Sequence, residues 1–249
     1  MGEILRVLNI TRRFGGLLAL DRASFTADDG QIVALVGPNG AGKTTLFAII
    51  TGFLRAHEGR IRYQGDDITG EPPYLLARRG IARTFQIAQP FAGLTVRENI
   101  AVGTHLSRRS RAAALTAAEE VAQTVGLAPM LDLAAANLTV AGRKRLELAR
   151  ALAIEPKLLL LDEVLAGLNP SEIRDMVPVI QAIQKRGITI VMIEHVMQAV
   201  MSLASQVFVL AEGRMIAMGP PQAIAADKRV IEAYLGHGAA VRMQGAANG

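Results

Sequence analysis

The sequence contains no cysteine, which excludes disulfide bonds and thiolate metal sites and suits a reducing compartment such as the cytosol. It also lacks a hydrophobic run of the roughly 20 residues that a membrane-spanning helix needs. The longest runs, such as ITIVMI at 188–193, have the length of buried strands. No charged segment followed by an apolar stretch opens the chain, so we expect a protein that is not secreted.

The composition is that of a globular protein, with 51% hydrophobic and 20% charged residues and a mean hydropathy of +0.29. A chain of 249 residues can bury a sizeable core as one large domain or as two closely packed subdomains. The formal charge is +5, and arginines gather at 78–79, 108–111 and 143–145. This balance suits polyphosphate, nucleic acid or an anionic membrane surface, although solvated surface arginines are an equal alternative for any one cluster.

The order of elements predicts an α/β fold with a helical insertion. The first third reads as strands with a single helix near Lys43, residues 95–155 read as several helices, and strands alternate with helices afterwards. The expected strands are 4–10, 22–27, 31–37, 60–65, 157–163, 188–194, 206–213 and 214–219, and the expected late helices are 171–187, 195–204 and two short ones before Gly236. Continuous apolar runs such as LLLL and ITIVMI are typical of parallel strands buried on both faces.

The segment LVGPNGAGKTT at 35–45 follows an expected strand and opens an expected helix. It matches G-x-x-x-x-G-K-[ST] with Gly37, Gly42, Lys43 and Thr44 at the fixed positions. Glycines let backbone N–H groups converge on phosphate oxygens, and the helix N-terminus adds partial positive charge. Lys43 can reach the β- and γ-phosphates, and the Thr44 hydroxyl can bind Mg²⁺. The alternative is a purely structural glycine turn.

Two acids, Asp162 and Glu163, follow the apolar run LLLL. Asp162 is placed to hold Mg²⁺ through water, and Glu163 can polarise an attacking water. The alternative is a pair that only caps the next helix. No N-K-x-D motif for reading guanine is present, so the pattern favours hydrolysis of a nucleoside triphosphate by a protein other than a GTPase.

With these motifs in order, the chain resembles the ATPase subunits of ABC transporters over about residues 3–236. The resemblance implies ATP and Mg²⁺ as cofactors. It also implies a P-loop (RecA-like) core at about 1–86 and 157–236, with an antiparallel β subdomain. An inserted α-helical subdomain would occupy about 87–156, and we expect 237–249 to be a flexible tail.

Further motifs of that family occur in its order: RTFQ with Gln86, LTVAG at 138–142, AGLNP at 166–170 and IEH with His195. The resemblance implies that Gln86 touches Mg²⁺ and the attacking water, that His195 contacts the γ-phosphate, and that Phe14 stacks on adenine. Taken alone, each of these three is more typical of a core, loop or capping residue. The ATP-binding residues that it implies are Phe14, Gly37, Pro38, Asn39, Gly40, Ala41, Gly42, Lys43, Thr44, Thr45, Leu138, Thr139, Val140, Ala141 and Gly142. Catalysis is assigned to Glu163, His195 and Gln86, and Mg²⁺ to Thr44, Gln86 and Asp162.

A narrower resemblance is to the ATPases of branched-chain amino acid importers, a group that includes urea and amide importers. It rests on RRFGGLLAL, TGFLRAHEGRI, GIARTFQ, FAGLTVRENI, LDEVLAGLNP, IEHVMQAVM and RVIEAYLG. The implied partners are a second ATPase subunit, permease subunits and, indirectly, a periplasmic or extracellular binding protein; nucleic acid is not among them. The implied location is the cytoplasmic face of the inner membrane. Alternatives are a weakly hydrolysing regulatory subunit and a soluble ABC ATPase outside transport.

Two departures from the family pattern bear on activity. Val164 stands where a proline usually follows the catalytic glutamate, and its presence predicts a looser turn. In LTVAG, Thr139 keeps the expected hydroxyl, but Val140 and Ala141 replace glycines. Ala141 would either be strained by a positive φ or crowd a phosphate, and Gly142 would relieve the turn. Since this segment serves the partner's ATP in the family, we expect an asymmetric dimer with one weaker site.

Overall fold

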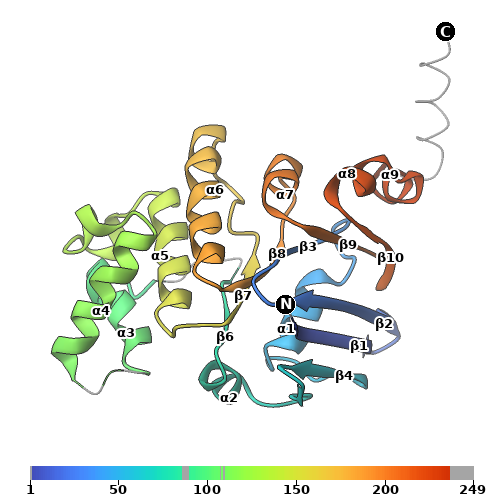
Figure 1. The fold of residues 1–249 in the computed structure, drawn as a ribbon, viewed down its shortest axis with the longest axis horizontal. Helices are drawn as coiled ribbons and strands as arrows, with labels where there is room; N and C mark the ends of the chain where they lie inside the picture. Colours follow the sequence, from blue (N-terminus) through green and yellow to red (C-terminus); the bar gives the residue numbers. More distant parts are fainter. Residues whose placement is uncertain (1, 86–89, 107, 109, 236–249) are drawn as a thin grey trace, which may run out of the picture.

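Two β-sheets and a set of flanking helices make up the molecule (Figure 1). The computed structural model describes residues 2–85, 90–106, 108 and 110–235. An antiparallel sheet has the order β2-β1-β4-β5, from β1 (Glu3–Phe14), β2 (Leu17–Asp28), β4 (Glu58–Tyr63) and β5 (Asp66–Asp67). A six-stranded sheet has the order β10-β9-β3-β8-β7-β6, from β3 (Ile32–Val36), β6 (Ile81–Arg83), β7 (Leu158–Asp162), β8 (Thr189–Ile193), β9 (Gln206–Ala211) and β10 (Arg214–Gly219).

Every pairing in the larger sheet is parallel except that of β10 with β9. The helices are α1 (Lys43–Ile50), α2 (Pro73–Arg78), α3 (Val96–Thr104), α4 (Arg111–Thr124), α5 (Val140–Leu152), α6 (Pro170–Lys185), α7 (Met197–Leu203), α8 (Pro221–Ala226) and α9 (Lys228–Leu235). The predicted α/β fold and its continuous buried strands are therefore confirmed. The expectation of a single helix in the first third is wrong, because the short α2 begins at a proline that suits a first helical turn.

Hydrophobic side chains fill both faces of the six-stranded sheet. All residues of β3, β7 and β8 are buried, as their uninterrupted apolar sequences predict. Alternate residues belong to two clusters, so that Val33 and Leu35 pack toward the antiparallel sheet and α1, whereas Ala34 and Val36 pack toward the helices. This packing fixes the carboxyl ends of the three strands side by side.

Helices α3, α4 and α5 lie together at one side of the molecule (Figure 1). Their grouping matches the expected helical insertion, although the division into a core and a subdomain remains an interpretation. Glu98 closes a capping box with Thr95 at the start of α3, and Ser110 caps α4. Within the part of the chain that the structure describes, none of these helices has the length and apolar character needed to cross a membrane. The expected tail at 237–249 lies outside the described residues.

Candidate nucleotide-binding site

The phosphate loop joins β3 to α1, as the motif predicts. Gly37, Gly40 and Gly42 have φ values of 150°, 79° and 104°, which L-amino acids with side chains rarely adopt. A Cβ at Gly37 would lie 1.9 Å from the Leu210 carbonyl oxygen, so only glycine fits there. The loop is thus a bare backbone cradle at a helix N-terminus, the geometry that binds phosphate.

Lys43 lies inside this cradle. Its Nζ donates hydrogen bonds to the carbonyl oxygens of Gly37 at 2.7 Å and Pro38 at 2.8 Å. Burial lowers the pKa of Lys43, and the negative charges of Glu163 and Asp162 act in the opposite direction. The ammonium group is therefore held where a polyphosphate would enter the loop.

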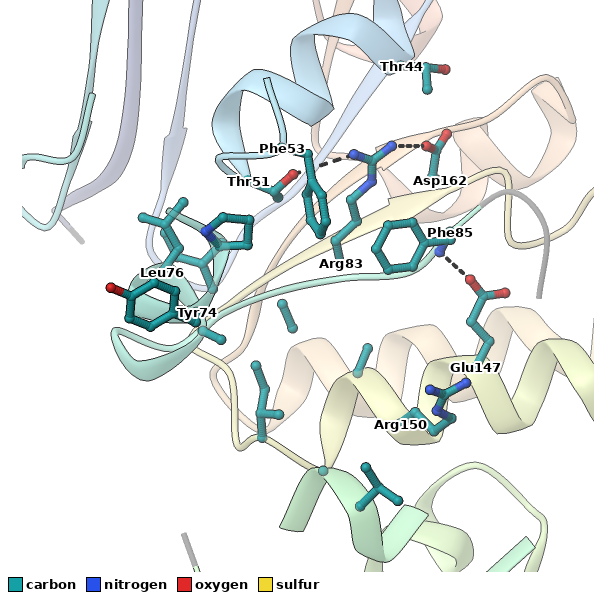
Figure 2. Close-up of a pocket in the computed structure, with 18 residues that line it drawn as sticks. Thr44, Thr51, Phe53, Tyr74, Leu76, Arg83, Phe85, Glu147, Arg150 and Asp162 are labelled. Atoms are coloured by element: carbon teal, nitrogen blue, oxygen red, sulfur yellow. Dashed lines mark hydrogen bonds and ion pairs between the residues drawn. The ribbon is translucent and has the colours of Figure 1, made fainter. Parts of the chain in front are cut away.

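Asp162 ends β7 and is 1% exposed. Its Oδ2 accepts a hydrogen bond from Nη2 of Arg83 at 2.6 Å (Figure 2). Its backbone N–H donates to Oγ1 of Thr84 at 2.9 Å. Oδ1 is buried and has no hydrogen-bond partner among the described residues. A buried carboxylate oxygen without a partner fits a site that holds Mg²⁺ or its water.

Thr44 would complete the metal site from the first turn of α1, near the end of β7 (Figure 2). Across the described ranges, no three His, Asp or Glu side chains gather as a metal site. Mg²⁺ is commonly held by one or two protein ligands together with substrate phosphates, so the available residues fit a nucleotide-bound Mg²⁺. Gln86, the third predicted ligand, lies outside the described residues.

Glu163 and His195 meet at the ends of β7 and β8. Nε2 of His195 donates to Oε1 of Glu163 at 2.8 Å, and the Glu163 side chain is 15% exposed. Glu163 has a left-handed backbone with φ 51°, an arrangement that costs about 1 kcal/mol or more and is typical of functional sites. The structure therefore brings together two of the three side chains to which the sequence assigns catalysis; the third, Gln86, lies outside the described residues.

The turn after Glu163 is closed although Val164 replaces proline. The Glu163 carbonyl accepts hydrogen bonds from the Ala166 N–H at 3.1 Å and from Nζ of Lys144 at 3.2 Å. The Glu163 N–H donates to the Ile193 carbonyl at 3.0 Å. Val164 is fully buried, so packing supports the turn where a proline ring is absent.

Glu194 lies beneath this turn and is 1% exposed. Its Oε1 accepts the Leu165 N–H at 2.9 Å. Burial raises the pKa of Glu194 to about 7, and the charge of Glu163 adds to the rise. Hydrogen bonds from the backbones of Leu165 and His195 and the charge of Lys144 act in the opposite direction. Glu194 thus ties the glutamate turn to the strand end that carries His195.

Phe14 ends β1, on the antiparallel sheet. The residue is 44% exposed, and the Arg12 guanidinium lies 4.8 Å from the ring centroid. This exposure suits a ring that stacks on a base, whereas a core role for Phe14 does not fit. Its contact with adenine remains a prediction.

The segment LTVAG is the start of α5. Thr139 is the N-cap, and its Oγ1 accepts the Gly142 N–H at 3.1 Å. Val140 and Ala141 are the first two helical residues, and Ala141 does not have a positive φ. The expectation of strain at Ala141 is therefore wrong, and so is a turn shifted to Gly142, because the helix starts before either residue. That the Ala141 methyl group crowds a phosphate stays a prediction.

A pocket of about 860 Å³, here called the lateral pocket, opens beside the phosphate site (Figure 2). Residues from α1, α2, β6, α3, α5 and β7 and from the segments next to them line this pocket. They include Thr44, Thr51, Phe53, Tyr74, Leu76, Arg83, Phe85, Val102, Gly103, Glu147, Arg150 and Asp162. Phe53, Tyr74 and Phe85 are exposed apolar side chains at this pocket. A buried carboxylate, Glu147, accepts the Phe85 N–H, and burial raises its pKa.

Sequence reasoning missed Arg83, Lys144, Glu147 and Glu194. The sequence did carry a signal for two of them: Arg83 opens the RTFQ motif, and Glu194 directly precedes His195. Lys144 and Glu147 lie on the buried face of α5 among apolar residues. Charged residues on an otherwise apolar helix face are rare, and that pattern could have indicated them. All four contact the backbone or side chain of a predicted site residue or its immediate neighbours.

A glycine cradle, an acid at a buried strand end and a glutamate–histidine pair together define a P-loop ATPase. The family described as "ABC transporter" matches residues 20–166, and that described as "Branched-chain amino acid ATP-binding cassette transporter" matches residues 214–240. The chain belongs to the ABC transporter family, and it is an ATPase of the kind that is coupled to transport.

Similar proteins cover nearly the whole chain. A Pseudomonas aeruginosa protein named high-affinity branched-chain amino acid transport ATP-binding protein BraF is 37% identical, covering 94% of this chain and 98% of its own. An Escherichia coli protein named high-affinity branched-chain amino acid transport ATP-binding protein LivG is 36% identical, also covering 94% of this chain and 98% of its own. The ADP conformation of an ATP-binding cassette from an ABC transporter has a TM-score of 0.87 and 33% identity, over 95% of this chain and all of its own.

Proposed function

We propose that this chain hydrolyses ATP to drive import of branched-chain amino acids through a membrane transporter. The carrying observation is the meeting of four groups at the carboxyl ends of β3, β7 and β8: the phosphate loop, Asp162, Glu163 and His195. The substrate class is inferred from the match of residues 214–240 and from the names of the similar proteins.

In the proposed mechanism, Lys43 and the loop N–H groups bind the phosphates, and Thr44, Asp162 and Gln86 would hold Mg²⁺. When bound, the ion would supply positive charge to the phosphoryl oxygens. Glu163 would orient and polarise the attacking water, and the hydrogen bond between His195 and Glu163 supports a shared role of the two side chains at the γ-phosphate. Phe14 would stack on the adenine.

The proposed working unit contains two ATPase subunits arranged head to tail. Residues 138–142 would complete the partner's site, because the N-terminus of α5 offers backbone N–H groups and a hydroxyl to a phosphate. ATP would then bridge the subunits, and hydrolysis would release them. The chain would work at the cytoplasmic face of the membrane, bound to permease subunits.

We assign the permease contact to the lateral pocket. The chemistry of the pocket supports this assignment, because the exposed side chains of Phe53, Tyr74 and Phe85 form an apolar lining next to Glu147 and Arg150. Residues of α2, α3 and α5 all contribute to this lining. The expected core and helical subdomains meet at this pocket, so a permease helix seated there would move with both.

The test is purification of the membrane complex followed by ATPase assays. We expect permease subunits to co-purify, and a leucine-loaded binding protein to stimulate turnover. Stimulation by a urea- or amide-loaded protein instead would overturn the substrate class. A chain that purifies without any membrane protein would favour a soluble ABC ATPase outside transport.

A second candidate is an ATP-binding subunit with weak or regulatory hydrolysis in an asymmetric transporter. The specific observation is Val140 and Ala141 at the N-terminus of α5, where the family pattern has glycine. In that case the weaker site would be the one that these residues complete on the partner. Single-turnover hydrolysis in the assembled complex distinguishes this candidate from an ATPase with two active sites. Retention of ATP at one site after the other has hydrolysed its ATP supports the asymmetric transporter.

A further inference from the structure

Arg83 makes the closest described ion pair to the metal site. Its Nη2 lies 2.6 Å from Oδ2 of Asp162, and the two side chains are 7% and 1% exposed. Nη1 donates to Oγ1 of Thr51 at 3.4 Å (Figure 2). The guanidinium carbon lies 5.8 Å and 5.3 Å from the ring centroids of Phe47 and Phe85. The pair is therefore enclosed by protein rather than screened by water.

A buried carboxylate requires a compensating charge, because desolvation penalises an isolated ion heavily. Lys43 also interacts electrostatically with Asp162, but its ammonium is hydrogen-bonded to the loop carbonyls of Gly37 and Pro38. Arg83 is the cation in contact with the carboxylate. Arg83 therefore supplies the positive charge that compensates the buried Asp162 carboxylate.

The carboxylate is only half used in this arrangement. Arg83 binds Oδ2, while Oδ1 has no hydrogen-bond partner in the ranges that the structure describes. Nε of Arg83 is likewise buried and without a hydrogen-bond partner there. A divalent cation near Oδ1 would repel the guanidinium, and buried charges so close interact strongly.

Arg83 also connects the metal site to the lateral pocket. It lines the pocket together with Asp162, and two residues later the Phe85 N–H is bound by Glu147 of α5. A weaker hold on Arg83 would loosen the end of β6, which leads directly to Gln86. Metal occupancy would thereby alter the wall of the pocket.

We propose that Arg83 is a positioning residue that acts as the counter-ion of Asp162 and competes with Mg²⁺ for it. Through this competition, Mg²⁺ binding at Asp162 changes the position of Arg83 and thereby the wall of the lateral pocket. The inference rests on the proposed nucleotide site and adds a control of Mg²⁺ affinity to it. The alternative is an ion pair that only joins β6 to β7.

The test measures fluorescent ADP binding to the full chain across a Mg²⁺ titration and in EDTA. Arg83→Gln keeps hydrogen-bond donors without charge, and Arg83→Lys keeps the charge. We expect Arg83→Gln to lower the half-saturating Mg²⁺ concentration about tenfold or more, because a neighbouring charge is removed. Binding in EDTA should stay within about threefold, since Arg83 is not a phosphate ligand, and Arg83→Lys should restore the wild-type Mg²⁺ dependence.

Arg79→Gln is the matched control, because Arg79 forms ion pairs with Glu71 and Asp66 and does not touch Asp162. An unchanged or raised Mg²⁺ requirement in Arg83→Gln overturns the counter-ion role. A wild-type chain that fails to bind nucleotide would instead overturn the nucleotide site on which the proposal rests.

Should Arg83→Gln not fold, hydrogen exchange of the wild-type protein decides. With ADP bound, addition of Mg²⁺ should speed amide exchange at Thr84 and Phe85 severalfold, because the ion pair that holds the end of β6 weakens. Equal or slower exchange with Mg²⁺ would overturn the proposal.

Discussion

At the residue scale, the site is built from polar side chains that are paired with one another or with the backbone. Asp162 is paired with Arg83, and Glu163 with His195. Glu194 is held by backbone N–H groups, with Lys144 nearby. Because each pair is partly or fully withdrawn from water, neutral substitutions that keep the shape of a side chain separate its charge from its packing.

Glu163→Gln should lower ATP turnover in the assembled transporter about a hundredfold or more, because the amide cannot polarise an attacking water. Nucleotide affinity should remain within about threefold, since Glu163 is not a phosphate ligand. Turnover assays alongside fluorescent ATP binding check both. Undiminished turnover in the complex would refute the catalytic assignment.

Glu194 makes stability depend on pH. Burial raises its folded pKa to about 7 from an ordinary 4.5, so the folded state binds the proton more tightly. Its contribution to the free energy of unfolding is fully present below about pH 4.5 and is lost as the pH rises through about 7. The loss is on the order of 3 kcal/mol.

Glu194→Gln should remove this part of the pH dependence, so that the variant matches wild type at pH 5 and exceeds it at pH 8. Denaturant unfolding at the two pH values measures the difference. Glu120→Gln on the exposed face of α4 is the control and should leave the profile unchanged. A variant no more stable than wild type at pH 8 would contradict the assigned cause.

At the scale of elements, α5 serves two purposes. Its N-terminus, capped by Thr139, is exposed, while Lys144 and Glu147 in its middle contact the glutamate turn and the end of β6. The helix therefore connects the segment 138–142, proposed to serve the partner's ATP, with this chain's own catalytic turn. Its first turn and its middle can be tested separately.

Thr139→Ala should cost about 1 kcal/mol of folding stability, because the Gly142 N–H loses its capping acceptor. Thr139→Ser keeps the acceptor and should restore most of the loss. Thermal or denaturant unfolding of the isolated chain measures both. A stability equal to wild type in Thr139→Ala would mean that the cap is exchanged for water at no cost.

Ala141→Gly should raise ATP turnover in the assembled complex by giving the partner's phosphate more room, since Ala141 carries no backbone strain that glycine could relieve. Glycine in a helix costs about 1 kcal/mol, so stability should fall slightly. Ala112→Gly at the equivalent position of α4 controls for that cost. Unchanged turnover would show that the alanine is tolerated.

At the scale of the whole molecule, the proposed sandwich predicts nucleotide-dependent association. In Glu163→Gln, which retains ATP, Mg²⁺–ATP should convert the chain to a dimer, whereas Mg²⁺–ADP should leave it monomeric. Two bound nucleotides would bridge the subunits and contribute contacts that a monomer cannot make. Sedimentation velocity distinguishes the two states, and a monomer with ATP bound would argue against pairing of identical chains.

The sequence predicted much of this fold for identifiable reasons. Continuous apolar runs such as 158–161 predict strands buried on both faces, and the glycine spacing of 37–42 predicts a phosphate loop. By contrast, the pairing of Arg83 with Asp162 depends on β6 lying beside β7, and these strands are far apart in the sequence. The conformation of Ala141 could not be read either, because a helix start depends on Thr139 capping rather than on the glycine pattern.

The position of β3 in the sheet also determines when it can pair during synthesis of the chain. β3 is flanked by β8 and β9, and both come from residues 189–211. Leu210 then closes over Gly37, and the Gly213 N–H binds the Ala41 carbonyl at 3.1 Å. On the ribosome, β3 therefore has both edges unpaired while residues 37–188 are made, which takes roughly 8–30 s at ~5–20 residues per second. A nascent chain that stops before β9 lacks the contacts that complete the phosphate loop, so it cannot bind ATP there. The unpaired edges of β3 are then where a chaperone would protect the chain most.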